Sequence, residues 1–296
     1  MAHKIVLTVD VEDWFQVENL KGCIPFSSWD KRELRVERNT HLLLDLFDSC
    51  SEKRKLRDCK SSDITVTFFV LGWIAEKLPH LVREIHERGH EVASHGYFHY
   101  LCTACSQVQL REELIRSKEY LEDIIGAPVV GFRAPSFSVS NTILETIRVS
   151  GYRYDSSYNS FDINERYGRV SLESFTKYGV AYEVYNDFYE LPVSNICLGR
   201  AILPWAGGGY FRLIPFPVFK RGVNYILERD GVYVFYIHPW EIDHKQPRVD
   251  NLPAFFKFRH YINLQKTLTK LRSFICTFPH CQFVSCKTYL ASVATE

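Results

Sequence analysis

The chain has 296 residues, enough for one large α/β domain, and no long linker, charge block or internal repeat divides it. Apolar residues make up 46% and charged residues 24%, which excludes a disordered chain, and a formal net charge of only +1 argues against a nucleic-acid partner. The sequence enters a strand pattern at once, without a secretory signal or a run of about 18 apolar residues. We therefore expect a cytoplasmic protein, with the inner membrane face as the alternative location.

The alternation of apolar runs with segments of helical period is typical of parallel strands joined by crossover helices. The first half of the chain begins with a predicted strand at Lys4–Val9, a helix from Asn39 or Thr40 and its basic exit loop at Lys53–Lys60. A strand at Ile64–Val70, a helix at Trp73–Arg88 with a restart at Pro79, a strand at His90–Ser94, a helix at Ser106–Ile125, a strand at Val129–Phe132, a helix at Asn141–Val149 and a strand at Tyr152–Tyr154 follow. The second half is predicted to contain hairpins and loops over Asp155–Leu213, then a helix at Pro217–Arg229, a strand at Val232–Ile237, a helix at Tyr261–Phe274 and a strand at Gln282–Val284. About seven βα repeats follow, which predicts a barrel or an open parallel sheet.

The nine cysteines are odd in number and scattered, which favours reduced thiols over a disulfide framework. One pair, Cys102 and Cys105, has the CxxC spacing. A structural zinc site would need a second such pair. We expect ordinary thiols, and no role is assigned to Cys102 and Cys105.

Polar residues follow four of the predicted strands, at the ends where parallel α/β proteins bind their ligands. These strand ends carry Asp10–Asp13, His95–His99, Arg133–Pro135 and His238–Glu241. We expect them to converge on one rim of the sheet. Asp10 directly follows five apolar or β-branched residues, a costly position for a carboxylate without a partner.

The spacing of His95 and His99 would place two imidazoles on one face of a helical turn, where both can bind one metal. A carboxylate as third ligand would leave positions open for water and substrate, as in hydrolytic metal sites. By itself the spacing is also explained by two histidines on a helix surface. The carboxylate cluster on a separate strand favours the metal site.

The acidic strand end, the HxxxH pair, the RxP loop and the late histidine occur in the order that resembles the polysaccharide deacetylase family, of the NodB-homology, carbohydrate esterase 4-like type. Segments such as TVDVEDWFQV, RGHEVASHGYFH, GFRAPSFSVS and FYIHPWEID are similar to the subgroup associated with bacterial exopolysaccharide and exosortase gene clusters. The resemblance spans nearly the whole chain. It implies a distorted (β/α)7 barrel over residues 1–296 as a single domain, with a C-terminal extension from about residue 245.

The same resemblance implies a divalent metal, usually zinc, with cobalt, nickel or manganese as alternatives, and N-deacetylation of a sugar. The implied roles are Asp10 as the general base, Arg133 as its partner, His238 as the general acid, and His95, His99 and a carboxylate as metal ligands. The family form has two adjacent aspartates where this chain reads Asp10-Val11-Glu12-Asp13. Glu12 is the third ligand if the strand continues, since alternate strand residues share a face, and Asp13 is the ligand if the chain has left the strand.

The implied substrate is an N-acetylated sugar that is nucleotide-linked, lipid-linked or oligomeric, handled in polysaccharide or glycolipid biosynthesis. The expected sugar contacts are Pro135, Trp14, Tyr210 and Trp240. Peripheral association with membrane polysaccharide machinery is a further expectation. Two alternatives stay open: an allantoinase-like hydrolase of a cyclic amide, and a non-catalytic carbohydrate-binding component of a polysaccharide assembly system.

Overall fold

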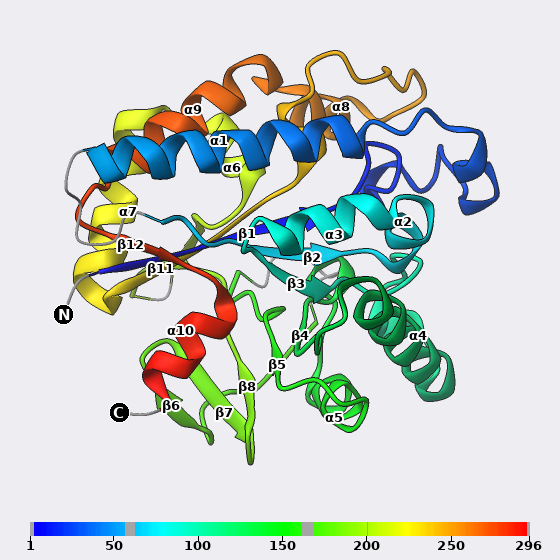
Figure 1. Ribbon diagram of the computed structural model, residues 1–296, viewed down its shortest axis with the longest axis horizontal. Helices are drawn as coiled ribbons and strands as arrows, with labels where there is room; N and C mark the ends of the chain where they lie inside the picture. Colours follow the sequence, from blue (N-terminus) through cyan, green and yellow to red (C-terminus); the bar gives the residue numbers. More distant parts are fainter. Residues whose placement is uncertain (1–2, 57–62, 162–167, 200, 295–296) are drawn as a thin grey trace.

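The computed structural model describes residues 3–56, 63–161, 168–199 and 201–294, and a curved parallel sheet organises them (Figure 1). Its parallel strands, in spatial order, are β11 (Val232–Ile237), β1 (Lys4–Val11), β2 (Thr67–Val70), β3 (Glu91–Ser94), β4 (Gly131–Phe132), β5 (Tyr154–Asp155) and β8 (Phe188–Glu190). Beyond β8 the sheet continues antiparallel with β7 (Ala181–Tyr185) and β6 (Thr176–Tyr178).

The two ends of the parallel row meet. Ser194, just after β8, donates its backbone N–H to the Val234 carbonyl of β11 at 3.2 Å. The Val234 N–H donates in turn to the Ser194 hydroxyl at 2.8 Å. The sheet therefore turns back on itself, and the predicted α/β fold of the distorted (β/α)7 barrel type is confirmed.

Strand β1 is the centre of this sheet. It pairs with β11 along one edge, and its other edge is shared by β12 (Gln282–Val284) near Lys4 and by β2 near Val11. Both ends of the chain are thus tied into one strand. Because strand residues alternate between faces, Ile5, Leu7 and Val9 pack in the core on the helix side, whereas Val6 packs inside the curve.

The helices are α1 (Val36–Leu56), α2 (Gly72–Lys77), α3 (Pro79–Glu87), α4 (Gln107–Ile125), α5 (Asn141–Val149), α6 (Gly208–Leu213), α7 (Phe216–Asp230), α8 (Ala254–Tyr261), α9 (Leu264–Thr277) and α10 (Cys286–Val293). Most of them cover the outer side of the sheet, where α1 and α9 lie side by side (Figure 1). The buried residues of α10 instead pack with Val6 in the cluster inside the curve. Within the described residues, no helix has both the length and the apolar character that crossing a bilayer requires.

Most predicted elements occur where the pattern placed them. The helix Asn141–Val149 and the strands Val232–Ile237 and Gln282–Val284 have the predicted bounds, and the helix after Trp73 restarts at Pro79 as predicted. The predicted strand from Ile64 is shorter, because it begins only at Thr67. Of the predicted exit loop Lys53–Lys60, the part up to Leu56 is helical, and residues 57–60 lie outside the described part of the chain.

The predicted helix Tyr261–Phe274 is wrong at its start. Helix α8 ends at Tyr261 and α9 begins at Leu264, because Asn263 between them adopts a left-handed conformation with a φ of 55°. Asparagine tolerates that conformation, which stops a right-handed helix. The segment Asp155–Leu213 contains the predicted hairpins, including β9 (Asn195–Leu198) paired with β10 (Ala201–Pro204), but its last residues form α6.

Candidate active site

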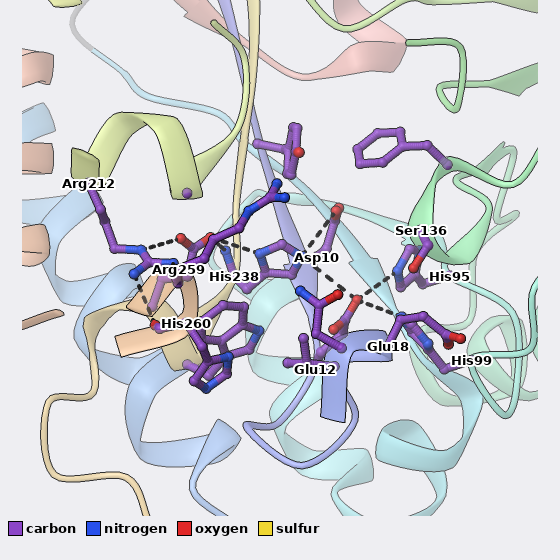
Figure 2. A pocket seen from close by; sticks show the side chains of 17 residues that line it. Asp10, Glu12, Glu18, His95, His99, Ser136, Arg212, His238, Arg259 and His260 are labelled. Carbon is purple, nitrogen blue, oxygen red and sulfur yellow. Dashed lines mark hydrogen bonds and ion pairs between the residues drawn. The ribbon is translucent and has the colours of Figure 1, made fainter. Parts of the chain in front are cut away.

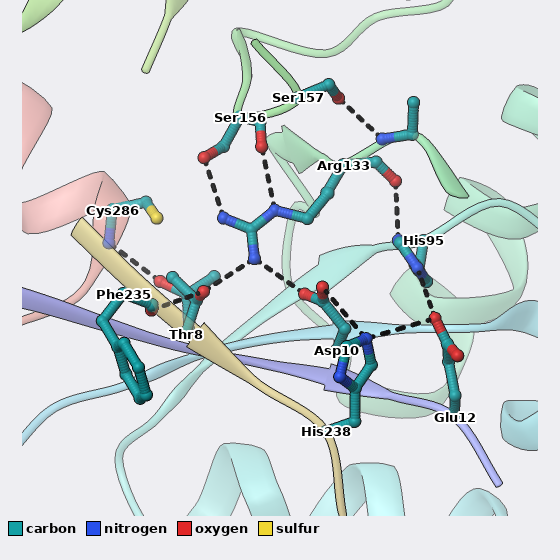
Figure 3. A network of polar contacts seen from close by, with 12 residues as sticks. Thr8, Asp10, Glu12, His95, Arg133, Ser156, Ser157, Phe235, His238 and Cys286 are labelled. Atoms are coloured by element: carbon teal, nitrogen blue, oxygen red, sulfur yellow. Dashed lines mark hydrogen bonds and ion pairs between the residues drawn. The ribbon is translucent and has the colours of Figure 1, made fainter. Parts of the chain in front are cut away.

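A buried arginine organises the inner end of the site (Figure 3). Arg133, directly after β4, is 0% exposed, and its Nη1 donates to Asp10 Oδ1 and to Thr8 Oγ1, each at 2.7 Å. Its Nε donates to the Ser156 carbonyl at 2.8 Å and its Nη2 to the Ser156 hydroxyl at 2.9 Å. The predicted pairing of Arg133 with Asp10 is therefore present. Arg133 contacts only Oδ1 of Asp10, so Oδ2 is not bonded to the arginine, and the carboxylate is held in one orientation.

Glu12, His95 and His99 form a compact cluster of potential metal ligands. Glu12 Oε1 lies 2.9 Å from His99 Nε2 and 3.1 Å from His95 Nε2, and one ligand atom from each residue lies within 4.8 Å of the others. All three side chains are buried. Two imidazole nitrogens and one carboxylate oxygen are a donor set that suits a divalent ion such as zinc, with a position left open.

The second ring nitrogen of His95 supports this assignment. His95 Nδ1 lies 2.8 Å from the Arg133 carbonyl oxygen, which can only accept, so Nδ1 carries the proton. Nε2 is then the ring nitrogen that faces Glu12 and would bind the metal. Metal-binding histidines are oriented in this way by a hydrogen bond from their other nitrogen.

The helical turn expected for the HxxxH pair is wrong. His95 follows β3, and the chain to His99 is an irregular loop in which Gly96 and His99 have left-handed conformations, with φ of 74° and 58°. Glu113 of α4 holds the loop by accepting a hydrogen bond from the Phe98 N–H at 3.0 Å. A positive φ is uncommon for residues other than glycine, although histidine adopts it more readily than most.

Of the two carboxylates considered as third ligand, only Glu12 faces the histidines. Asp13 lies at the start of α1, where its Oδ2 accepts from the backbone N–H groups of Arg35 at 2.6 Å and Val36 at 2.9 Å. Its Oδ1 accepts from the Trp14 N–H at 2.7 Å. Burial raises the pKa of Asp13 to about 6, although these hydrogen bonds oppose the shift. Asp13 is thus a helix cap, outside the pocket that Glu12 lines.

His238 occupies the other side of the same pocket. Its Nε2 lies 3.8 Å from Asp10 Oδ2 and 3.8 Å from Glu12 Oε1, and its Nδ1 lies 2.8 Å from Glu241 Oε1. Burial lowers the pKa of His238, but the charge of Glu12, the hydrogen bond and charge of Glu241 and the charge of Asp10 outweigh it and raise the pKa to about 9. These neighbours favour the protonated ring, the form that can donate a proton.

Glu12 is ionised in the same arrangement. Burial by itself would raise the pKa of Glu12, but the charges of His99 and His238 and the hydrogen bonds from His95 and His99 hold it well below its usual value. An ionised carboxylate is the form that a metal requires.

Glu241 and Arg212 are site residues to which sequence reasoning assigned no role. Glu241 lies in the 3-10 helix η5 (Pro239–Ile242), and its Oε2 accepts a hydrogen bond from Arg212 Nε at 2.7 Å. Burial raises the pKa of Glu241, yet Arg212 and His238 outweigh it and lower the pKa to about 2. Glu241 follows His238 by three residues, a short spacing that could have indicated their contact from the sequence. For Arg212, which lies 29 residues before Glu241, the sequence carries no such signal.

Arg212 also connects α6 with the segment between α8 and α9. Its Nη1 donates to the carbonyls of His260 at 3.0 Å and Ile262 at 2.8 Å, and its Nη2 donates to the Arg259 carbonyl at 3.2 Å. Next to it, a Cβ at Gly208 would collide with the Glu241 carboxylate, so glycine is required there.

One of the four predicted sugar contacts lines the pocket. Trp240 lies between His238, with ring centroids 5.3 Å apart, and His260, with ring centroids 4.4 Å apart and planes inclined by 8°. It therefore packs against the expected acid, His238, and is part of the pocket wall.

The other three predicted sugar contacts do not line it. Trp14 is buried, with its indole N–H donated to the Glu33 carbonyl at 3.2 Å. Pro135 is buried near Gly96, under the histidine loop. The Tyr210 ring packs against Arg259 outside the pocket lining. These aromatic and proline side chains are occupied by packing, which is the commoner fate of such residues at strand ends.

The pocket is built by both halves of the chain (Figure 2). The lining residues are Asp10, Glu12, Val17, Glu18, Asn19, His95, His99, Ser136 and Phe137 from the first half, and Gly209, Arg212, Tyr236, His238, Trp240, Glu241, Arg259 and His260 from the second. Cys102 and Cys105 are free thiols outside this lining, as are the other described cysteines, and Cys59 lies outside the described residues.

Comparison with known proteins divides the chain at β5. Residues 37–154 match the family model "Polysaccharide deacetylase", and residues 156–291 match "Domain of unknown function (DUF3473)". A peptidoglycan deacetylase of Helicobacter pylori is 31% identical over 130 residues, 44% of this chain and 44% of that protein. A peptidoglycan-N-acetylglucosamine deacetylase of Bacillus cereus is 26% identical over 87 residues, 29% of this chain and 40% of that protein. These matches support the polysaccharide deacetylase family.

The matched segments span less than half of those relatives. Among solved structures, a protein of Mycobacterium smegmatis described as a candidate polysaccharide deacetylase superposes with a TM-score of 0.63 at 19% identity, over 100% of this chain and 92% of that one. A peptidoglycan N-acetylglucosamine deacetylase superposes with a TM-score of 0.50 at 14% identity, over 96% and 86%. At these identities the likeness concerns the fold.

Proposed function

We propose that this chain is a metal-dependent hydrolase that removes N-acetyl groups from an amino sugar of a glycan. The observation that carries the proposal is the placement of Glu12, His95 and His99 in one pocket with Asp10 and His238. This arrangement offers a ligand set, a carboxylate base and a protonated acid around one space. Metal-assisted hydrolysis of an amide uses all three.

A divalent ion, zinc by preference, would be held by Glu12, His95 and His99 and would polarise the acetyl carbonyl and acidify water. The chain's own part begins at Asp10. Its Oδ2 is turned away from Arg133 and toward His238, so it can accept the proton of the attacking water. Arg133 orients this carboxylate through the charge-assisted hydrogen bond to its Oδ1.

His238 completes the reaction from the other side. Water adds to the acetyl carbon, the C–N bond breaks, and the amine leaving the sugar takes a proton from His238 Nε2, so the products are acetate and a free amine. Glu241 accepts the Nδ1–H of His238 and fixes the plane of the ring, while Trp240 packs against its face. Arg212 holds Glu241 in turn, which makes it a positioning residue.

The proposed substrate is an N-acetylated sugar that is oligomeric or attached to a nucleotide or lipid carrier. The relatives named as peptidoglycan deacetylases support the N-acetylated glycan. The exopolysaccharide and exosortase subgroup, association with membrane machinery, and use in polysaccharide or glycolipid biosynthesis stay predictions from sequence resemblance.

The decisive experiment is the release of acetate from N-acetylglucosamine oligomers and from carrier-linked N-acetylglucosamine, with and without a chelator. We expect chelator to abolish release, zinc to restore it, and Asp10→Asn to lower kcat by about 10²–10⁴-fold, the usual contribution of a general base. Asp45→Asn, at an exposed carboxylate of α1, is the matched control. Release that a chelator leaves intact would refute the mechanism. A protein that only binds carbohydrate would release no acetate from any of these compounds.

A further inference from the structure

We propose that Arg259 selects substrates that carry an anionic group, a carboxylate or a phosphate, beside the N-acetylated sugar. The proposal rests on the proposed function and adds the charge of the substrate to it. Arg259 comes from α8 in the second half of the chain and lines the same pocket as Asp10 and His238. Figure 2 shows its side chain extending into that pocket from the α8 side.

The guanidinium of Arg259 is held in place by packing. Its Cζ lies 5.5 Å from the centroid of the Tyr210 ring, an attractive cation–π geometry. On the neighbouring residue, a Cβ at Gly209 would lie 3.9 Å from Arg259 Nε, an ordinary van der Waals distance. The side chain is half-buried, so part of its freedom is already lost before any ligand binds.

The hydrogen-bonding capacity of Arg259 is unused. Among the residues that the structure describes, none accepts a hydrogen bond from its guanidinium, and no carboxylate lies within ion-pair distance of it. All five N–H donors of the group are thus available. The other arginine of the pocket is different, because Arg212 donates hydrogen bonds to Glu241 and to three backbone carbonyls.

The carboxylates that line the pocket already have cationic or histidine partners. Asp10 is bound by Arg133, Glu12 by His95 and His99, and Glu241 by Arg212 and His238. Glu18 lies 3.6 Å from Lys21. An anionic group that enters therefore finds the acidic residues paired and, at Arg259, a guanidinium whose donors are free.

The planar fork of a guanidinium fits two oxygens of a carboxylate or a phosphate. Two sources of such a group are compatible with the proposed substrate: a uronic acid next to the N-acetylated sugar, and the phosphate of a nucleotide or lipid carrier. Acetate, the product, is released from every substrate and cannot by itself cause a preference between neutral and anionic ones.

The test compares matched neutral and anionic probes on the metal-loaded enzyme. The neutral probes are N-acetylglucosamine and chitotetraose, and the anionic probes are UDP-N-acetylglucosamine and a hyaluronan tetrasaccharide. UDP-N-acetylglucosamine is matched with N-acetylglucosamine, and the hyaluronan tetrasaccharide with chitotetraose. For Arg259→Gln, we expect kcat/KM on at least one anionic probe to fall roughly tenfold more than on its matched neutral probe, mainly through KM. A loss of this size is expected for a partly screened charge-assisted hydrogen bond. Arg259→Lys should retain part of the preference. The control is Lys257→Gln, which removes the same charge from α8 outside the pocket and should match wild type on all probes.

The anionic probe that responds identifies the source of the charge. The inference is overturned if wild type shows no preference for either anionic probe, or if Arg259→Gln changes neutral and anionic probes equally. Calorimetric binding of the same probes to the metal-loaded Asp10→Asn variant, with and without Arg259→Gln, separates the two proposals. If no probe is hydrolysed but binding of an anion depends on Arg259, the proposed function fails and the anion site stands.

Discussion

Glu12 and Asp13 are adjacent carboxylates with different surroundings, and the difference is one of residue-scale geometry. Glu12 continues the alternation of β1 past its end and reaches the two histidines, whereas Asp13 turns toward the N-terminus of α1. Three backbone N–H groups occupy the oxygens of Asp13. Two neighbouring carboxylates can thus separate into a proposed metal ligand and a helix cap.

We therefore predict opposite effects of two conservative substitutions. Glu12→Gln should weaken zinc binding by more than about 100-fold, beyond the loss typical of an outer-shell partner, with little change in folding. Asp13→Asn should retain the metal but lower the free energy of unfolding by about 1–2 kcal/mol, because one of its two acceptor oxygens becomes a donor. Metal content per chain and urea unfolding of the two variants measure this. An Asp13→Asn protein without metal would reverse the assignment.

His90 provides a prediction on pH. It is buried against the Phe47 and Phe68 rings, and neither of its nitrogens has a hydrogen-bond partner among the described residues. Burial lowers its pKa from 6.5 to about 4. As the pH falls, His90 is therefore protonated in the unfolded chain at a higher pH than in the folded protein. The contribution of neutral His90 to the free energy of unfolding is complete above pH 6.5 and is lost as the pH falls toward 4.

When the pH falls between those two values, the free energy of unfolding of His90→Leu should decrease by up to about 3 kcal/mol less than that of wild type. It should also be no less stable at neutral pH, since it replaces an unsatisfied ring by an apolar side chain. Urea unfolding at pH 7 and pH 4.5 measures both effects. The exposed His280, changed to leucine, is the control and should keep the wild-type slope. Equal slopes for wild type and His90→Leu would contradict the prediction.

At the scale of elements, the site depends on how α6, η5 and α8 pack together. Arg212 of α6 holds Glu241 of η5 and the carbonyls at the end of α8, so one arginine sets the distance among three short helices. Gly208, at the start of α6, leaves the room that the Glu241 carboxylate occupies. The position of His238 thus depends on a glycine in another element.

Gly208→Ala should displace Glu241 and lower kcat by roughly 10- to 100-fold, as expected when a catalytic group shifts by about 1 Å. The metal content should be unchanged, because Glu12, His95 and His99 lie across the pocket. Gly22→Ala, where nothing lies within 4 Å of the added Cβ, is the control. Loss of metal together with activity would instead indicate a general disruption of the fold.

At the scale of the whole molecule, the N-terminal strand is held by the C-terminal half. Strand β1 pairs with β11 along one edge and with β12 on part of the other, and Arg133 needs Ser156. The part that matches the deacetylase model, residues 37–154, contains neither β1 nor those partners.

A fragment of residues 1–154 should therefore fail to fold cooperatively. It would expose one edge of β1 and lack His238 and Glu241, and long-range strand pairing is the part of a fold that a truncated chain cannot replace. Thermal unfolding followed by circular dichroism, with metal content beside the full chain, measures this. A sharp melting transition with one metal per chain would show that the first half is an independent unit.

The α/β class, most of the elements and the order of the strand ends that carry Asp10, His95, Arg133 and His238 could be predicted from the sequence, because hydrophobic period is a local property and parallel strands end at one edge. That Glu12 faces the two histidines while Asp13 faces the start of α1 is visible only in the tertiary structure, since it depends on the turn after β1. The tertiary structure also decided that the HxxxH pair lies in a left-handed loop, that Trp14, Pro135 and Tyr210 are packed away from the pocket, and that Arg212 and Glu241 support His238. Those outcomes arise from contacts between residues far apart in the chain, whose geometry no local pattern encodes.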